Sequence, residues 1–370
     1  MVRRCALLLS ALLLTGAAPS APSTDGVPPL EPEALPTMAR TDRFSWFALP
    51  VLFWLPETRL GYGATGGLHF HLHGAPRASS VFLVAAYTLN EQGSLDVASD
   101  IYLRSGTLLS GRARAVVFPD AFYGLGPDST TGAREPYTRR WLQAIGSAEF
   151  AVLSPNLRAG PRLDLRAEDI GGLRPGGVLA SGKLEGANGF TAVGVGGSVT
   201  WDTRDRPLFP RHGSFAEAWF LEYPESLGRH RRFSVANVEG RIFLPLGAER
   251  VLGAAAFGEE AFGEVPFTLL PKLGSSRFLR GWREGRFRDH VAWAAQAELR
   301  LPLVDRVVGT VFGAFGDVAP DFGSLRADSL KVAGGIGLRY RLTPEGANVR
   351  LDFAESAAGP EVYILLLDAF

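Results

Sequence analysis

Five arginines lie within the stretch RFLRGWREGRFRD, which runs from Arg277 to Asp289. Guanidinium groups at this density could bind nucleic acid, hold a phosphate, coat a membrane surface or fill a cavity by pairing with carboxylates. The whole chain, however, balances 38 basic against 38 acidic residues and has a pI near 7.0. Because nucleic-acid binding normally requires a basic excess, this balance argues against a nucleic-acid partner. The cluster is a local feature, and its role depends on the elements around it.

Three histidines alternate in HFHLH, where His69, His71 and His73 would share one face of a strand. Histidines two residues apart on a strand can share a zinc ion, but no carboxylate that could support them lies nearby in the sequence. We therefore interpret them as polar residues near the end of a strand, and we expect no metal site.

The glycines of GYGATG, from Gly61 to Gly66, match a dinucleotide-binding fingerprint, which requires a helix directly after it. Here a two-residue alternation continues through GLHFHLH instead, which indicates a strand. The sequence contains no G-x-S-x-G motif, and its six histidines do not single out a catalytic base. We expect neither an enzyme nor a bound cofactor.

The chain begins with MVRRCALLLSALLLTGAAPSAPS, in which two arginines precede a short apolar run and a group of small residues. This order is typical of a secretory signal peptide, which we assign to 1–21. We interpret the proline-rich residues 22–43 as a periplasmic linker and 44–370 as one barrel domain. Because Cys5 is the single cysteine, we expect a mature protein without disulfides.

From Phe44 onward, several windows alternate between apolar and polar residues, as strands require. In SLDVASDIYLR, Leu95 and Val97 oppose Asp96 and Asp100, whereas RRFSVANVEGRIF alternates imperfectly. A soluble sandwich would also alternate, but a membrane barrel turns its apolar face outward and keeps polar groups inside. The signal peptide, the aromatic-rich apolar faces and the glycines opposite them favour an all-β fold, a transmembrane antiparallel β-barrel.

The lengths of the links between strands support this fold independently. Short turns are expected at Thr343–Gly346, Leu303–Asp305 and Leu246–Glu249, and longer links at Ala319–Asp328, Glu264–Asp289 and Tyr223–His230. Bacterial barrels combine short periplasmic turns, long outer loops and an even number of strands. Alternating these links back to Phe44 predicts about sixteen strands, with both termini on the periplasmic side.

Two motifs resemble those of a known family. WDTRDRPLFPRHGSF, from Trp201 to Phe215, is similar to the D-x-R-x-x-P-x-x-P-x-x-G signature that links two strands in bacterial surface antigen barrels. LRGW, from Leu279 to Trp282, resembles the (V/L)-R-G-(F/Y) tip of their long sixth extracellular loop. These barrels belong to the BamA/TamA outer-membrane assembly and translocation family, and the resemblance is most specific over 190–370.

The resemblance implies that the long extracellular loop folds into the lumen and that acidic groups of the inner wall hold its arginine. The matching residues are Arg280 and Gly281 in the loop, Glu298 in QAELRLP and Asp317 in VFGAFGDVA. A buried guanidinium needs paired carboxylates to offset its desolvation, so a triad of Arg280, Glu298 and Asp317 is physically reasonable. Alternation independently places Glu298 on the polar face of its strand.

We interpret the DTRDRP segment as an architectural link at the periplasmic end of the barrel. Its acidic and basic side chains can form local charge-assisted hydrogen bonds, while its prolines and glycine fix a tight connection. The candidate residues are Asp202, Arg204, Asp205, Pro207, Pro210 and Gly213. The terminal Phe370 resembles the C-terminal aromatic residue that the outer-membrane assembly machinery recognises.

Family members that insert or secrete proteins usually carry periplasmic POTRA domains of about 75 residues each. No such domain fits between the expected signal peptide and Phe44, so the chain resembles a barrel-only branch. We expect an outer-membrane location in a Gram-negative-type bacterium, with the lipid bilayer, lipopolysaccharide and the assembly machinery as partners, and a separate periplasmic partner or client protein as a further candidate. Protein assembly, insertion or translocation is the leading hypothesis; a passive pore or small-solute transporter and a structural surface antigen are the alternatives.

Overall fold

A computed structural model describes residues 44–75, 77–206, 208–342 and 348–366. The expected signal peptide and linker lie outside these residues, as do Pro207 and Phe370. The described chain is almost entirely strand, with only short 3-10 turns in the links.

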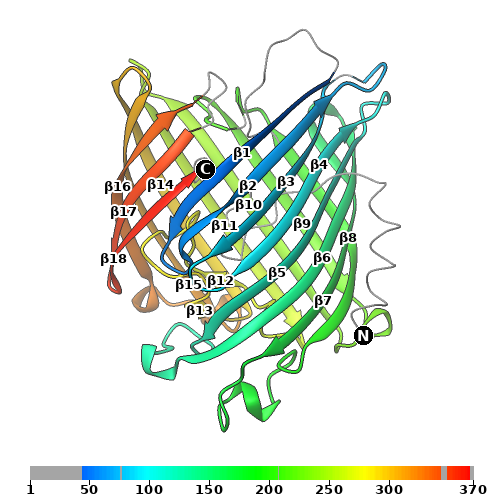
Figure 1. Ribbon diagram of the computed structural model, residues 1–370, viewed down its shortest axis with the longest axis vertical. Helices are drawn as coiled ribbons and strands as arrows, with labels where there is room; N and C mark the ends of the chain where they lie inside the picture. Colours follow the sequence, from blue (N-terminus) through cyan, green and yellow to red (C-terminus); the bar gives the residue numbers. More distant parts are fainter. Residues whose placement is uncertain (1–43, 76, 207, 343–347, 367–370) are drawn as a thin grey trace.

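Sixteen strands form one closed antiparallel barrel, as the link lengths predicted (Figure 1). In Figure 1 the first strand (blue) lies beside the last one (red), which closes the barrel. The strands are β1 (Phe44–Leu55), β2 (Arg59–Phe70), β3 (Ser79–Thr88), β4 (Gly93–Tyr102), β5 (Leu108–Phe122), β6 (Glu135–Val152), β7 (Ser154–Gly171), β8 (Phe190–Asp202), β9 (Gly213–Tyr223), β10 (Phe233–Pro245), β11 (Val251–Gly263), β14 (Val291–Val304), β15 (Val307–Ala319), β16 (Lys331–Arg341), β17 (Asn348–Ser356) and β18 (Gly359–Leu366). Two further strands, β12 (Lys272–Leu273) and β13 (Phe287–Arg288), pair with each other within the link between β11 and β14.

The outer face of the barrel is apolar and the inner face is polar. On β16, Ile336 and Leu338 are exposed on the outer face. Arg339, which follows Leu338, points inward and is fully buried. On β4, Leu95 is exposed and Asp96 is buried. Because lipid contacts the outward side chains, this inverted arrangement is the one that a membrane barrel requires. The prediction of a transmembrane barrel rather than a sandwich is confirmed.

The links differ in length between the two ends of the barrel. The long links expected after β9, β11 and β15 are present at one end, and the two-residue turn after β14 lies at the other. Since long loops of such barrels are extracellular, the end with the long links faces outward. At this extracellular end the links beside the closure are short, at residues 56–58 after β1 and 357–358 after β17.

Strand β2 contains the whole of GYGATG, so this motif opens no helix. The strand ends at Phe70, and for this reason His71 and His73 lie in the following link rather than on one strand face with His69. No group of three or more metal-binding side chains occurs in the described part of the chain. No helix among the described residues is long and apolar enough to cross a membrane.

Candidate functional site: the inward loop and its anchors

The link between β11 and β14, residues 264–290, packs against the inner wall of the barrel. Small inward side chains on β14, β15 and β16 leave space for it, among them Ala292, Ala294 and Ala333, all buried. Against them pack the large apolar side chains of the loop. These are Leu273, Phe278, Leu279, Trp282 and Phe287. Burying one such side chain stabilises the inward position of the loop by roughly 1.5–3 kcal/mol. Apolar packing therefore contributes to this position alongside the charge pairing described next.

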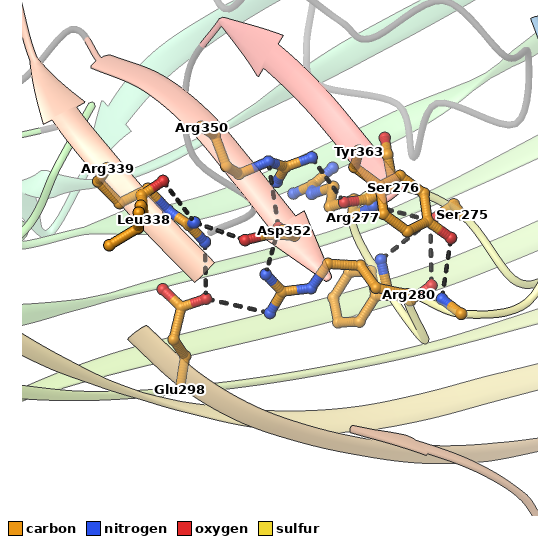
Figure 2. Close-up of polar contacts among 12 residues, drawn as sticks. Ser275, Ser276, Arg277, Arg280, Glu298, Leu338, Arg339, Arg350, Asp352 and Tyr363 are labelled. Carbon is orange, nitrogen blue, oxygen red and sulfur yellow. Dashed lines mark hydrogen bonds and ion pairs between the residues drawn. The ribbon is translucent and has the colours of Figure 1, made fainter. Parts of the chain in front are cut away.

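Arg280 is a fully buried charged group of the loop. Its Nη2 donates to Glu298 Oε2 at 3.0 Å and its Nη1 donates to Asp352 Oδ2 at 2.8 Å, and all three side chains are 0% exposed (Figure 2). The guanidinium also lies over the ring of Phe312, 3.5 Å from its centroid. The loop tip is thereby fixed to β14 and β17, two strands that are separated by β15 and β16 in the barrel wall.

Further arginines of the inner wall surround the same two carboxylates. Arg339 on β16 donates to Glu298 at 3.0 Å and to Asp352 at 2.5 Å, Arg300 reaches Glu298 at 3.3 Å and Arg350 reaches Asp352 at 3.4 Å. Four guanidinium groups therefore share two carboxylates. Each carboxylate pairs with several arginines. Removing either carboxylate should therefore destabilise the cluster more than removing any single arginine.

The second carboxylate is Asp352 and not Asp317, which corrects the prediction. Asp317 is buried, but its carboxylate accepts a hydrogen bond from the Ser329 hydroxyl, and no contact joins it to Arg280 within the described chain. The register explains the difference, because Glu298 lies opposite Phe312 while Asp317 lies five residues further along β15. At about 3.3 Å per residue this separation is about 16 Å, too far for one guanidinium to bridge.

Asp352 was missed although the sequence carries a signal for it. In NVRLDFAES, the strand β17, Arg350 and Asp352 alternate with Val349, Leu351 and Phe353. The alternation places both charged residues on the inner face, as it does for Glu298. The alternation therefore marks Asp352 as a candidate inward carboxylate, but it does not pair it with Arg280.

The other four arginines of RFLRGWREGRFRD also have partners in the described structure. Arg277 pairs with Glu239 on β10 at 2.5 Å, and Arg283 approaches Glu361 on β18 at 3.6 Å. Arg286 donates to the Ser129 carbonyl at 2.6 Å, in the link after β5. Arg288 is fully buried and donates to the carbonyl of Phe267 at 3.4 Å. The five arginines therefore contact the barrel wall and the neighbouring links.

Gly281 has a conformation that other residues rarely adopt. Its φ is +106°, and a Cβ at this position would lie 3.3 Å from the Cβ of Ser356. Its N–H donates to the Tyr363 hydroxyl at 2.8 Å, and its carbonyl accepts from the Ser356 hydroxyl at 2.7 Å. Glycine therefore lets the loop backbone approach β17 and β18 closely.

The DTRDRP link enters the barrel from the periplasmic end. Asp202 binds the Arg204 guanidinium through both oxygens at 3.0 and 2.9 Å, and Asp205 Oδ1 accepts from the backbone N–H of Arg211 at 2.8 Å. Gly213 has φ +102°, and a Cβ there would lie 2.3 Å from the Thr203 carbonyl oxygen. These contacts lie within the link itself, as an architectural element requires.

The same link also reaches the charged cluster of the lumen. The carbonyl of Pro210 accepts from Arg300 Nη1 at 2.9 Å, and the Arg300 guanidinium lies 4.3 Å from the ring centroid of Phe209. Because Arg300 also contacts Glu298, the periplasmic link and the extracellular loop meet around one carboxylate.

The sequence matches the Omp85 superfamily domain over residues 146–361, more than half of the chain. The chain belongs to the Omp85 superfamily. Together with the closed barrel, this membership makes it an outer-membrane protein of a Gram-negative bacterium. The resemblance to BamA/TamA barrels is confirmed at the level of the family. No curated protein sequence matches the chain significantly.

Solved structures of this superfamily have the same fold. BamA from Haemophilus ducreyi lacking POTRA domains 1-3 superposes with a TM-score of 0.63 at 17% identity, covering 90% of this chain and 74% of that one. CdiB from Escherichia coli gives 0.58 at 11% identity, covering 90% of this chain and 64% of the other. CdiB from Acinetobacter baumannii gives 0.57 at 11% identity, with 88% and 60% covered. The chain thus spans less than two thirds of each CdiB chain.

Proposed function

We propose that this Omp85 barrel assists the insertion or translocation of proteins at the outer membrane. The incoming chain would pair with the junction between β1 and β18. Family membership supports a role in protein insertion or translocation. The pairing of β1 supports the β1–β18 junction as the place where the incoming chain binds. Any periplasmic partner or client protein would approach this junction, and the bilayer and lipopolysaccharide surround it.

The observation that carries the proposal is the unequal pairing of β1. On one side it pairs with β2 along its whole length, from Phe44 opposite Phe70 to Leu55 opposite Arg59. On the other side, among the strand residues that the structure describes, it pairs with β18 only at Trp54 opposite Ile364. A strand with unpaired N–H and C=O groups is a template for another strand.

Pro50 in the middle of β1 fits this role. Proline has no N–H to donate, and within sheets it is confined to edge strands, strand starts and bulges. Its presence indicates that β1 is built as an edge, although the barrel is closed. The packed loop counts against the alternative of a wide passive pore, because it occupies part of the lumen.

The proposal is tested by locking the junction with a disulfide. Cysteines replace Trp54 and Ile364 in a Cys5→Ser background, and a control lock joins Val238 to Gly258, which face each other on β10 and β11. In liposomes, the reduced protein should accelerate folding of an added outer-membrane barrel, followed by its altered gel mobility. Oxidation should abolish this acceleration for the Trp54/Ile364 lock and leave the control lock active.

Equal acceleration with the junction oxidised would falsify this site. A large, steady conductance in planar bilayers, together with no effect on client folding, would instead support the passive pore. Neither activity in a correctly folded barrel would leave the structural surface antigen as the remaining function.

A further inference from the structure

The tip of the inward loop contacts both sides of the β1–β18 junction. On the β18 side, Gly281 donates its N–H to the Tyr363 hydroxyl at 2.8 Å, and Arg283 lies 3.6 Å from Glu361. On the β1 side, the N–H of Glu284 donates to Glu57 Oε1 at 2.8 Å. Glu57 lies in the short link that follows β1. Four consecutive loop residues therefore connect the last strand to the end of the first.

The contact on the β1 side is held in place by a neighbouring link. The carbonyl of Glu57 accepts from Asn90 Nδ2 at 2.7 Å and from Gln92 Nε2 at 3.3 Å, both at the turn between β3 and β4. Burial raises the pKa of Glu57, while the N–H of Glu284 and the charge of Arg283 act in the opposite direction. The two hydrogen bonds to its carbonyl fix the backbone of Glu57, and its half-buried carboxylate accepts from the loop backbone.

The contact on the β18 side comes from a buried hydroxyl. Tyr363 is 0% exposed and faces the lumen, where Figure 2 shows it beside the loop. The neighbouring strand adds a second hydrogen bond, from Ser356 to the carbonyl of Gly281 at 2.7 Å. Both backbone groups of Gly281 are therefore held by the two strands that precede the junction.

We propose that residues 281–284 form a latch that keeps the β1–β18 junction closed, with Tyr363 and Glu57 as its two attachment points. The latch holds these strands together where β1 and β18 share little backbone pairing. Opening the junction then requires its release. This inference deepens the proposed function, since it specifies what regulates the proposed opening.

The surroundings allow the latch to be released without burying new charge. Glu57, Arg283 and Glu284 line a hollow of about 500 Å³, together with Asn90 and Asp120. Charged groups that leave the latch can be hydrated in this hollow. The Arg280 pairs and the packing of Phe278 and Phe287 can persist while residues 281–284 detach, because these three side chains lie outside the latch; of the apolar side chains of the loop, release affects the packing of Trp282.

The test measures the distance across the junction in the folded barrel. Spin labels at Tyr87 on β3 and Phe353 on β17, both exposed outward, lie four strand positions apart across the junction. Labels at Val238 on β10 and Val332 on β16 lie four positions apart within the continuous wall. Pulsed dipolar spectroscopy in liposomes gives both distance distributions.

Glu57→Ala removes the acceptor of the Glu284 N–H, and Tyr363→Phe removes the acceptor of the Gly281 N–H. Each variant should increase the fraction of long distances across the junction. We expect about a tenfold increase for each hydrogen bond lost, and more for the double variant. The control pair should be unchanged, which also verifies that the barrel is folded. Glu57→Gln keeps an oxygen acceptor and should resemble the parent, as should Tyr340→Phe on the outer face of β16.

An unchanged distribution across the junction in the double variant, with the control pair intact, overturns the latch. Client folding in the same variants separates the two proposals. Faster folding with a wider junction supports both. A wider junction without faster folding supports the latch and contradicts the proposed function.

Discussion

Two segments enter the lumen from opposite ends and are held there in different ways. The extracellular loop is held by side chains of other elements, through Arg280 with Glu298 and Asp352 and through Arg277 with Glu239. The periplasmic link is held mainly by its own residues, through Asp202 with Arg204 and Asp205 with the backbone of Arg211. The first is attached through contacts between distant parts of the chain, whereas the second is a turn between β8 and β9 whose contacts are mostly its own. The proposed latch lies in the first of these segments.

The largest effect is expected at the carboxylate that several arginines share. Glu298→Ala removes a carboxylate partner of Arg280, Arg300 and Arg339, of which only Arg280 and Arg339 keep Asp352, and we expect it to lower the free energy of unfolding by about 3–5 kcal/mol. Urea unfolding in liposomes measures this change. Glu298→Gln keeps an acceptor oxygen and should cost less. If both variants unfold like the parent, the cluster does not hold the loop.

A smaller effect is expected in the periplasmic link, where the constraint is backbone conformation. Gly213→Ala places a Cβ in the left-handed region at φ +102° and 2.3 Å from the Thr203 carbonyl oxygen. We expect a loss of about 1–3 kcal/mol in the same unfolding experiment. Gly240→Ala is the matched control, since no atom lies within 4 Å of its Cβ position. Equal stability of the two variants would mean that the link is not rigid.

A third prediction addresses the point where the two segments meet. Arg300→Met removes the hydrogen bond to the Pro210 carbonyl and a contact with Glu298, but it also relieves repulsion among four guanidinium groups. We expect a net loss of about 1 kcal/mol. Combined with Arg280→Met, the two changes should be non-additive by at least about 0.5 kcal/mol in a double-mutant cycle. Strict additivity would show that loop and link are independent.

The sequence alone was sufficient for the barrel and for one wall residue of the site. Outward residues contact lipid and inward residues contact polar groups, so each strand keeps a two-residue period that can be read without knowing its neighbours. The family resemblance singled out Glu298, and this period placed it on the inner face. The strand RRFSVANVEGRIF looked irregular because Phe233, Val235 and Phe243 point inward, where they pack against the loop.

The partner of Arg280 could not be deduced in the same way. Pairing across the lumen depends on the register and tilt of several strands, and these place Asp352 rather than Asp317 at the level of the loop tip. The latch contacts were equally hidden, since Glu57 and Tyr363 are more than 200 and about 80 residues away from the loop tip in sequence. Only the closed barrel brings them together.

The smallest effect should occur at the solvent-exposed edge of the periplasmic link, where Arg211 lies 2.9 Å from Glu249 of the neighbouring turn. The hydrogen bond from Arg211, and then its charge, lower the pKa of Glu249 below its ordinary value. A carboxyl with a lowered pKa in the folded state stabilises the fold above its unfolded pKa, and this contribution is lost as the pH falls through the lowered value. The difference in denaturation midpoint between the parent and Glu249→Gln should therefore be small above about pH 5 and vanish in stronger acid. High salt should reduce it as well, because the pair is exposed. A pH-independent difference would assign the effect to the turn backbone, which has φ +62° at Glu249, rather than to the ion pair.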